Sequence, residues 1–352
     1  MIKKMENFSK YLIKNNSTVK SALKSLSNVG HDTILFVVNE KNQLLGSITD
    51  GDIRRGLLSG LKIDDNFNDT INKTTKYIRK NNYSINQVVE FRSQNITVFP
   101  LLDKNDVIID IINLREKQSY LPLDVVIMAG GKGLRLKPLT DYLPKPLLKI
   151  KNKCIIDYNV DRLIDYGAEN FFISVNYLGN LVEKHFDNRK DINISTKFIH
   201  ENKPLGTVGA VSKIKEFKNE YVLITNSDII TNINYEDFLI DFIKKDADMS
   251  VVSIPYEIEV PYAVMKTEND LIKSFEEKPT YTYFSNGGIY LVKKHILDKI
   301  PKNRFYNMTQ LMQEVLNDNL KLINYSSKDY WIDIGKHRDF KKAQKDMDLI
   351  KF

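Results

Sequence analysis

Three glycines and several basic side chains follow one short apolar run near the middle of the chain. The run ends at Ala129, and the glycines that follow it are Gly130, Gly131 and Gly133. Small residues let backbone amides approach phosphate oxygens closely, and nearby cations supply the balancing charge. The cations are Lys132, Arg135, Lys137 and Lys145. The segment therefore predicts a site for phosphate groups.

Three prolines lie among these cations, at Pro138, Pro144 and Pro146. A proline fixes its own φ angle, so the loop should be stiff and its cations should stay aimed inward. The glycine spacing matches neither the P-loop nor the dinucleotide-binding G-x-G-x-x-G pattern. A merely solvated basic loop would need neither the prolines nor the glycines, which favours phosphate binding.

Two aspartates are candidate metal ligands. Asp228 follows an apolar run, and Asp333 lies in the segment from Trp331 to Gly335. Two carboxylates together with phosphate oxygens suit Mg²⁺, which prefers oxygen ligands and keeps several waters. A single aspartate is more often a helix cap or a turn residue. Because the two occur together with a phosphate-binding loop, we favour the metal interpretation.

Residues 201–210 form a further polar segment between an expected strand and an expected helix. Gly206 leaves room for a flat base against the backbone, and Glu201 can accept hydrogen bonds from the edge of a base. The alternative is an ordinary helix N-terminus. We expect this segment to contact the base.

The second half of the chain must position these groups, and there apolar runs alternate between strand and helix patterns. Strands are expected at 124–129, 171–175, 196–200 and 221–225, and helices at 156–166, 181–186, 206–214 and 235–245. This alternation predicts an α/β fold with a Rossmann-like, mainly parallel sheet. In such sheets ligands bind at the carboxyl ends of the strands.

The first hundred or so residues contain a weak internal repeat. Residues 34–38 can be laid over 97–101, and 44–48 over 105–109, with an offset near 61. Each copy has the pattern of a helix, a strand, a turn and a second strand. Residues 114–122 are polar and end in proline, so they predict a linker. We therefore expect an α+β pair at 1–118, with copies at about 9–60 and 70–118, and a second domain at 119–352.

Composition narrows the partners and the compartment. The 352 residues carry a formal charge of +7, yet no run of like charges stands out, which argues against nucleic acid and favours small anions. Cys154 is the single cysteine, so no internal disulfide can form and a reducing compartment is expected. No apolar stretch has the length of a membrane span. We expect a soluble, cytoplasmic protein without a membrane partner.

The segment from Met128 to Pro146 resembles the signature of sugar-1-phosphate nucleotidyltransferases, A-G-G-x-G-T-R-L-x-P-L-T followed by P-K-P, with Leu134 in place of the usual threonine. The resemblance covers about residues 122–352. It implies nucleotidyl transfer from a triphosphate to a sugar 1-phosphate, with Mg²⁺ as cofactor. The implied catalytic residues are Arg135, Lys145 and Asp228, and the implied metal ligands are Asp228 and Asp333.

The same resemblance assigns the two substrates to separate groups of residues. The nucleotide would contact Ala129, Gly130, Gly131, Gly133, Glu201, Gly206 and Thr207. The sugar phosphate would contact Glu277, Lys278, Asn286 and Gly288. One departure concerns the sugar, because Ala263 stands where these enzymes commonly have glycine.

Gly46 to Ile53, Gly-Ser-Ile-Thr-Asp-Gly-Asp-Ile, resembles a cystathionine-β-synthase (CBS) domain motif, and residues 9–118 resemble a pair of such domains. The resemblance implies that Thr49 and Asp52 hold the ribose of an adenine nucleotide, and that the pair is regulatory or dimerising. In the second copy, the offset of 61 sets Asp110 against the threonine and Asn113 against the aspartate. A dimerisation or spacing module without a ligand is the alternative. Because CBS pairs commonly associate, we expect a homo-oligomer.

The base loop, with glutamate and Pro-Leu-Gly-Thr, resembles that of guanylyltransferases, which implies GTP. A CBS pair joined to such a domain resembles most closely the glucosamine-1-phosphate guanylyltransferases of legionaminic acid biosynthesis. The expected products are GDP-glucosamine and pyrophosphate, for nonulosonic (legionaminic) acid or surface glycan synthesis in bacteria. The alternatives are a mannose- or heptose-1-phosphate guanylyltransferase, another sugar-1-phosphate nucleotidyltransferase, or a non-catalytic nucleotide-binding regulatory subunit.

Overall fold

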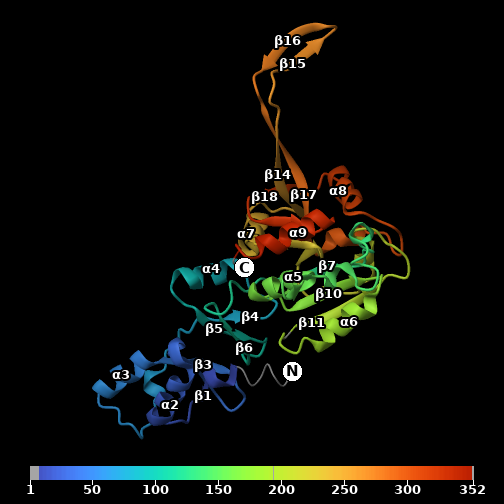
Figure 1. Cartoon of the computed structure of the whole chain (residues 1–352). Coiled ribbons are helices and arrows are strands. Elements are labelled where there is room, and N and C mark those ends of the chain that lie inside the picture. The colour runs from blue at the N-terminus through green and yellow to red at the C-terminus, as the bar shows by residue number, and fades with distance from the viewer. Residues whose placement is uncertain (1–7, 193, 351–352) are drawn as a thin grey trace. The chain divides into compact units, whose positions relative to one another are not determined.

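The computed structural model describes residues 8–192 and 194–350, shown in Figure 1. The chain divides into two compact units. The first runs to Pro122 and includes Asp165–Gly167, and the second contains Leu123–Ile164 and the residues from Ala168 onwards. We call the second the catalytic unit. None of the described helices is both long enough and apolar enough to cross a membrane.

The first unit contains two three-stranded sheets of the same topology. In each sheet the first two strands are parallel and the last two are antiparallel. The sheets are β1(Leu12–Lys14)-β2(Ile34–Val38)-β3(Leu44–Thr49) and β4(Ile78–Arg79)-β5(Val98–Leu102)-β6(Ile108–Asn113). The helices beside them are α2(Val19–Val29), α3(Asp50–Leu58) and α4(Ile85–Ser93). The predicted internal repeat is confirmed.

The offset of the repeat differs from the one expected. Ile34 pairs with Thr49 in the first sheet and Val98 pairs with Asn113 in the second, so equivalent residues lie 64 apart, not 61. Asn113 is therefore the counterpart of Thr49, and the earlier assignment of Asp110 to that place was wrong. The turns have the same length in both copies, because Val38 pairs with Leu44 and Leu102 pairs with Ile108. The error arose because short apolar runs can be aligned one to three residues out of register and still match.

The catalytic unit is built on a seven-stranded mixed sheet of order β11-β10-β7-β12-β17-β14-β18. The first four strands in this order are parallel, and β17 is antiparallel to both of its neighbours. The strands are β7(Leu123–Met128), β10(Asn170–Val175), β11(Ser195–His200), β12(Tyr221–Asn226), β14(Met249–Glu259), β17(Thr280–Lys293) and β18(Leu322–Ser326). The predicted mixed, mainly parallel α/β sheet is confirmed.

Helices and short strand pairs surround this sheet. The helices are α5(Ile155–Asp165), α6(Gly179–Asn188), α7(Tyr235–Lys244), α8(Met308–Asn317) and α9(His337–Asp346). The short strand pairs are β8(Lys149–Ile150) with β9(Lys153–Cys154), and β13(Ile229–Thr231) with β19(Trp331–Asp333). The pair β13 and β19 joins segments about a hundred residues apart in sequence. It brings together the two candidate metal ligands, since Asp333 ends β19 and Asp228 directly precedes β13.

One expected helix is absent from its place. Residues 206–214 contain only the short 3₁₀ segment Gly209–Lys213. The amides of Val208 and Gly209 donate to the carbonyl of Tyr306, a hundred residues away. The first amides of a helix have no acceptor within it, so these bonds do not by themselves exclude a helix. The prediction failed because the backbone leaves the helical region at Gly206, with a φ angle of +80°, and at Val208, with a φ angle of −146°.

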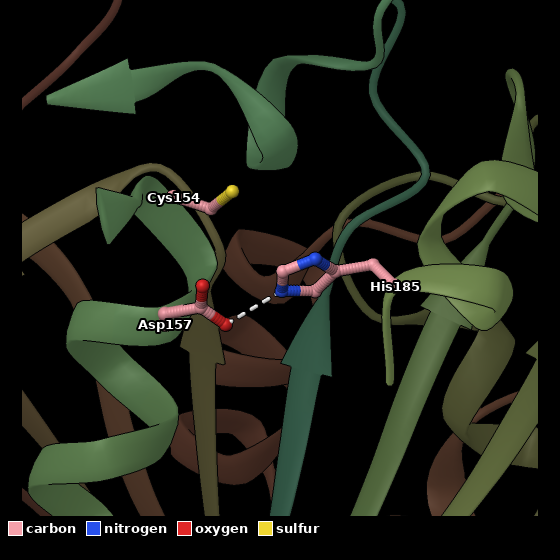
Figure 2. A group of neighbouring side chains, drawn as sticks. All are labelled: Cys154, Asp157 and His185. Atoms are coloured by element: carbon pink, nitrogen blue, oxygen red, sulfur yellow. Dashed lines mark hydrogen bonds and ion pairs between the residues drawn. The ribbon is translucent and has the colours of Figure 1, made fainter. Parts of the chain in front are cut away.

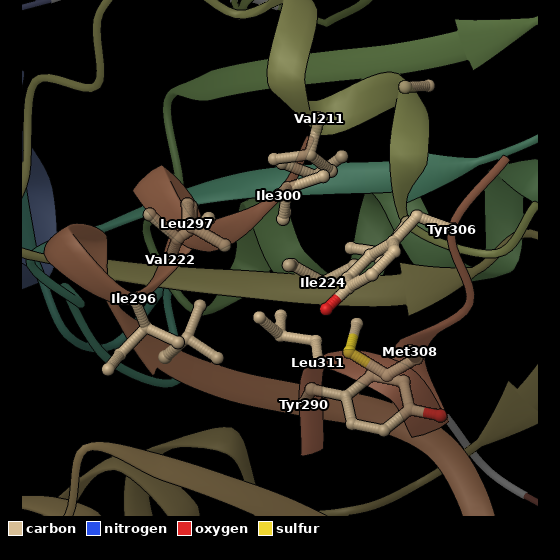
Figure 3. Packing of buried hydrophobic residues seen from close by; sticks show 14 of the residues in the cluster. Val211, Val222, Ile224, Tyr290, Ile296, Leu297, Ile300, Tyr306, Met308 and Leu311 are labelled. Carbon is tan, nitrogen blue, oxygen red and sulfur yellow. The ribbon is translucent and has the colours of Figure 1, made fainter. Parts of the chain in front are cut away.

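One apolar core supports this region, as Figure 3 shows. Ile224 of β12 and Tyr290 of β17 pack with Met308 and Leu311 of α8 and with Val211 of the 3₁₀ segment. All five side chains are at least nine-tenths buried. The core thereby fixes the loop after β11 against the start of α8.

Strands β14 and β17 continue beyond the sheet as a two-stranded ribbon, which Figure 1 shows projecting from the catalytic unit. The ribbon ends in the pair β15(Val264–Glu268) and β16(Leu271–Glu276). We call residues 254–285 the arm. At its base a change in register between Val251 and Ser253 separates the buried part of β14 from the exposed part.

Candidate active site

A pocket of about 350 Å³ lies at the carboxyl ends of the parallel strands, where the sequence predicted a ligand. Each of four strands delivers a residue to it from the loop that follows: Gly130 after β7, Asn176 after β10, Glu201 after β11 and Asp228 after β12. Seven of the predicted site residues line it, namely Gly130, Gly131, Lys145, Glu201, Gly206, Thr207 and Asp228. Lys132 and Pro146 of the basic segment line it as well.

Gly133 shapes the basic loop from within. Its φ angle is +62°, and a Cβ atom there would stand 2.9 Å from Cγ2 of Thr140. The Thr140 hydroxyl donates to the Gly133 carbonyl at 2.9 Å, and the amide of Leu136 donates to the same oxygen. Gly133 thus closes the loop on itself and is outside the pocket lining, as is Ala129, which is buried.

Lys145 is the centre of a charged cluster with both predicted metal ligands. Its ammonium pairs with Asp228 Oδ2 and lies 3.9 Å from Asp333 Oδ1. The Lys145 side chain is only 10% exposed, against 24% for Asp228 and 45% for Asp333. The two aspartates meet because Ile229 pairs with Asp333 across β13 and β19. Local sequence gave no sign of that pairing.

Burial raises the pKa of Asp333 above its ordinary value, and the negative charge of Asp228 raises it further. One carboxylate oxygen on each aspartate, Oδ1 in both, is buried without a hydrogen-bond partner among the described residues. Two neighbouring carboxylates, each with an oxygen that has no hydrogen-bond partner, are ligands that a hard divalent cation prefers. The residues present therefore fit Mg²⁺.

Arg135 stands beside this cluster. A Cβ atom on Gly335 would lie 3.4 Å from the Arg135 guanidinium and 3.5 Å from Asp333 Oδ2, so the three groups are neighbours. The positive charge of Arg135 also acts to lower the pKa of Asp333, against the larger effects of burial and Asp228. The structure thus brings Arg135 to the metal-ligand side of the site.

The Glu201 carboxylate already holds the loop that carries it. Ser174 donates to Oε1, and the amide of Leu205 donates to Oε2 at 3.0 Å. A Cβ atom on Gly130 would lie 2.8 Å from Oε1, so the glycine-rich turn packs directly on this carboxylate. Glu201 lines the pocket, but both of its oxygens are engaged within the chain.

Gly206 and Thr207 connect the base loop to the start of α8. Gly206 has a φ angle of +80°, and a Cβ atom there would stand 2.6 Å from the Tyr306 carbonyl. The Thr207 hydroxyl accepts from the Met308 amide at 2.8 Å, and its amide donates to Asn307. The glycine is thus required by a close backbone approach, which sequence reasoning had attributed to a bound base.

The sequence analysis missed several lining residues, among them Asn176, Asn226 and Phe305. Asn176 follows β10 and Asn226 ends β12, so the rule that ligands bind at strand carboxyl ends would have found them. Phe305 is 59% exposed and comes from the loop before α8. Nothing in the sequence around Phe305 indicates that it lines a pocket.

The four sugar-phosphate candidates separate into two places. Asn286 Oδ1 accepts from the Gly288 amide and the Tyr290 hydroxyl, at the base of the arm. A Cβ atom on Gly288 would meet the Asn226 side chain at 2.8 Å, which ties this turn to the pocket. Glu277 and Lys278 lie out on the arm and are not among the residues that line the pocket.

The model of the family described as "Nucleotidyl transferase" matches residues 124–348, nearly two thirds of the sequence. The chain belongs to this nucleotidyl transferase family. A CBS domain model matches residues 11–59.

Curated relatives of this nucleotidyl transferase include the D-glycero-alpha-D-manno-heptose 1-phosphate guanylyltransferase of Aneurinibacillus thermoaerophilus. It is 30% identical over 229 residues, which cover 64% of this chain and 98% of the relative. Mannose-1-phosphate guanyltransferase beta-A of Xenopus laevis is 29% identical over 227 residues. That match spans 62% of this chain and 62% of the relative, less than two thirds of its length.

Among solved structures, HddC from Yersinia pseudotuberculosis aligns with a TM-score of 0.51 and 27% identity, covering 64% of this chain and 99% of that one. The same protein complexed with GMP-PN aligns with a TM-score of 0.50 and 26% identity. These likenesses all concern the catalytic unit of this nucleotidyl transferase.

In the CBS region of this nucleotidyl transferase, Thr49 and Asp52 bond to each other. The Thr49 hydroxyl donates to Asp52 Oδ2 at 2.7 Å and accepts from the Asp52 amide, which caps α3. Asp52 also pairs with Arg55. A pocket of about 390 Å³ is lined by Asp52, Arg55, Gly56, Ser59, Leu61, Asp69 and Thr70. Asp52 therefore reaches a pocket, whereas Thr49 is outside its lining.

A second cluster in the catalytic unit resembles a metal site in composition only. Figure 2 shows Cys154, Asp157 and His185, whose potential ligand atoms lie within 4.8 Å of one another. His185 and Arg189 both bond to Oδ1 of Asp157, at 2.8 and 3.0 Å, so a cation already occupies the carboxylate. Burial raises the pKa of the Cys154 thiol to about 11, which keeps it neutral. We interpret this cluster as a structural link between α5 and α6.

Proposed function

We propose that the chain transfers a nucleotidyl group from a nucleoside triphosphate to a sugar 1-phosphate and releases pyrophosphate. The observation that carries this proposal is the cluster of Lys145, Asp228 and Asp333 beside the glycine-rich loop. The cluster combines a cation with two metal-binding carboxylates at the end of a phosphate-binding turn. Membership of the nucleotidyl transferase family supports the same reaction.

The reaction needs no covalent enzyme intermediate. An oxygen of the sugar phosphate forms a bond to the α-phosphorus, and the bond from that phosphorus to the bridging oxygen breaks as pyrophosphate leaves. The attacking oxygen is already an anion, so no general base is required. The protein must instead position two polyanions and balance their charge. Lys145 would contact the reacting phosphate and Arg135 the departing pyrophosphate.

Asp228 and Asp333 would hold Mg²⁺, and the unspent Oδ1 atoms support this assignment. When bound, the ion would neutralise negative charge on the triphosphate oxygens. The glycine-rich turn would contribute backbone amides at Gly130 and Gly131, where a Cβ atom would crowd Glu201 in the first case and meet open space in the second.

For the substrates, we propose GTP and glucosamine 1-phosphate, giving GDP-glucosamine for legionaminic acid synthesis or for a bacterial surface glycan. The names of the relatives support a guanine nucleotide, as does the HddC complex with GMP-PN. They equally support mannose or heptose 1-phosphate as the sugar. Glucosamine rests on the joined CBS domain alone.

Pyrophosphate release tests the proposal directly. The full-length chain with Mg²⁺ is assayed against four nucleoside triphosphates, each with glucosamine, mannose and heptose 1-phosphates. We expect release with GTP and one sugar phosphate only, and no release when Mg²⁺ is chelated. Silence with every pair, together with GTP binding in calorimetry, would instead support a non-catalytic nucleotide-binding subunit.

For the first unit we propose an adenine nucleotide as ligand, held at the pocket that Asp52 and Arg55 line. Calorimetry on the full-length chain with AMP and ATP is the test, with Asp52→Ala as the variant. If neither binds and neither alters the rate, the unit is a spacing or dimerising module.

A cytoplasmic location stays a proposal that rests on the single cysteine.

A further inference from the structure

The loop that carries Arg135 buries little of its own surface. We call residues 133–143 the Arg135 loop. Only Leu136 and Thr140 in this loop are buried, whereas Leu139 and Tyr142 are exposed, Tyr142 at 90%. Apolar side chains stabilise a loop when they are removed from water, and exposed ones add little. The position of the Arg135 loop therefore depends on hydrogen bonds more than on packing.

The two buried side chains hold the start of the loop. Leu136 packs in an apolar cluster with Ile334 and with Ala343 of α9. Thr140 donates to the Gly133 carbonyl at 2.9 Å, but this bond ties the loop only to itself. Other contacts must hold the far side of the loop against the rest of the catalytic unit.

His337 makes the first of these contacts. Its ring Nε2 lies 2.8 Å from the carbonyl oxygen of Lys137, 200 residues away in sequence. A carbonyl oxygen can only accept a hydrogen bond, so Nε2 carries the proton and donates. His337 is the first residue of α9, and Lys137 is two residues beyond Arg135.

The helix that carries His337 is itself firmly anchored. Ala343 is fully buried in the apolar cluster. Gln344 donates to the Lys149 carbonyl at 2.9 Å and accepts from the Lys151 amide at 2.8 Å. Residues seven apart lie on the same side of a helix, so His337 and Gln344 point in similar directions from α9. The helix is therefore a fixed support from which His337 reaches the loop.

Tyr177 makes the second contact. Its hydroxyl lies 2.9 Å from the Asp141 carbonyl and 3.2 Å from the Thr140 carbonyl, which share its single proton. Tyr177 follows β10 by two residues, and its neighbour Asn176 lines the pocket. Strand β10 pairs with β7 on one side and with β11 on the other. The loop is thus held from the sheet as well as from α9.

These contacts decide where the Arg135 guanidinium stands. Among the described residues, no hydrogen bond or ion pair engages the Arg135 side chain, so its place depends on where its backbone is held. The guanidinium lies beside Gly335 and Asp333, and Gly335 is only two residues before His337. One short segment therefore packs against the arginine and also bonds to its loop. A displacement of about 1 Å in such a cation would weaken its contact with a phosphate.

We propose that Tyr177 and His337 are positioning residues that clamp the Arg135 loop and thereby hold Arg135 in place for the departing pyrophosphate. Neither side chain is among the residues that line the pocket, so each acts through a backbone carbonyl of the loop. The inference rests on the proposed function, because pyrophosphate is the group that Arg135 would contact.

Single substitutions test each contact. Tyr177→Phe removes one hydroxyl, and His337→Ala removes the ring, whereas His337→Gln keeps an N–H donor near the place of Nε2. We expect Tyr177→Phe and His337→Ala each to lower kcat/KM for the triphosphate about 3- to 10-fold, the size of one hydrogen bond, with KM for the sugar phosphate unchanged. His337→Gln should restore most of the wild-type rate. Tyr142→Phe is the matched control, since among the described residues no hydrogen bond engages the Tyr142 hydroxyl.

A double-mutant cycle separates a positioning role from a general effect on the fold. If the two residues act through Arg135, then Tyr177→Phe or His337→Ala should cost less than about twofold once Arg135→Ala is already present. Equal losses in the two backgrounds would mean that these residues do not act through Arg135, and the inference would be wrong.

Hydrogen exchange of residues 133–143 tests the clamp without any turnover. We expect Tyr177→Phe and His337→Ala to speed exchange of the loop amides, and His337→Gln and Tyr142→Phe to leave it unchanged. If the wild type releases no pyrophosphate, the proposed function fails, and exchange still decides whether the clamp exists. If the wild type is active, unchanged exchange in Tyr177→Phe and His337→Ala would overturn the clamp. Faster exchange with a full kcat/KM would show that the contacts stabilise the loop without positioning Arg135, which would also overturn the inference.

Discussion

Two clusters in the catalytic unit each place an aspartate beside a cation, and they differ in how completely the carboxylate is satisfied. Asp228 and Asp333 share Lys145, and each keeps one buried oxygen without a hydrogen-bond partner among the described residues. Asp157 instead bonds both His185 and Arg189. The first cluster has buried carboxylate oxygens without hydrogen-bond partners in the described chain, next to a pocket, whereas in the second a guanidinium and an imidazole already bond to the carboxylate.

The pKa shifts follow the same division. Burial would raise the pKa of Asp157, but the hydrogen bond from His185 and the charge of Arg189 hold it below its ordinary value. Burial and the charge of Asp228 raise the pKa of Asp333. A carboxylate whose charge is balanced by hydrogen bonds and cations stabilises the fold. A buried carboxylate beside another negative charge costs stability and is available to bind a cation. We therefore propose that similar side chains serve structure at Asp157 and chemistry at Asp228 and Asp333.

We call Lys145, Asp228 and Asp333 the open cluster, and Cys154, Asp157, His185 and Arg189 the closed cluster. The largest expected effect follows from disabling the open cluster. Asp228→Asn or Lys145→Ala should lower turnover about 100-fold or more, because each removes charge that balances the reacting phosphates. Pyrophosphate release measures the rate, and circular dichroism checks the fold. A folded variant with a near-normal rate would contradict the site assignment.

Disabling the closed cluster should lower the stability of the fold and leave turnover nearly unchanged. Asp157→Asn removes the charged partner that His185 and Arg189 share, although Arg189 keeps its ion pairs with Asp161 and Asp191. We expect a loss of about 1 to 3 kcal/mol in the free energy of unfolding. Urea unfolding measures it. Turnover per folded molecule should stay within about twofold of wild type. A loss of turnover without a loss of stability would mean that this cluster takes part in the reaction.

The two clusters should also differ in the sign of their pH dependence. The pKa of Asp157 is lowered in the folded state, so its contribution to stability is present above its ordinary value of 3.8 and is lost as the pH falls through the folded pKa. The pKa of Asp333 is raised, so its ionisation costs stability as the pH rises. Asp157→Asn should destabilise most at neutral pH, whereas Asp333→Asn should slightly raise Tm there. Urea and thermal unfolding from pH 3 to 7 measure both, and equal signs would refute the comparison.

Sequence reasoning located the open cluster because its signals are local. Glycines and cations within one loop, and an aspartate directly after an apolar run, need no tertiary information. It missed what distant segments decide: the close approach of Gly206 to the Tyr306 carbonyl, where a helix was expected at 206–214, and the pairing that brings Asp333 to Asp228. The sequence also gave no sign of the arm, because a strand pattern does not show whether a ribbon packs on the sheet or projects from it.

The smallest expected effect concerns metal binding at the closed cluster. With a pKa near 11, the Cys154 thiol is almost wholly protonated at pH 8, so a thiol reagent should label it about 100-fold more slowly in the folded chain than after unfolding. Zn²⁺ should leave both the labelling rate and Tm unchanged, because Arg189 already neutralises Asp157, whereas Mg²⁺ should raise Tm in wild type and not in Asp228→Asn. A Zn²⁺-dependent rise in Tm that disappears in Cys154→Ser would show that the closed cluster binds metal, and the contrast between the two clusters would then be wrong.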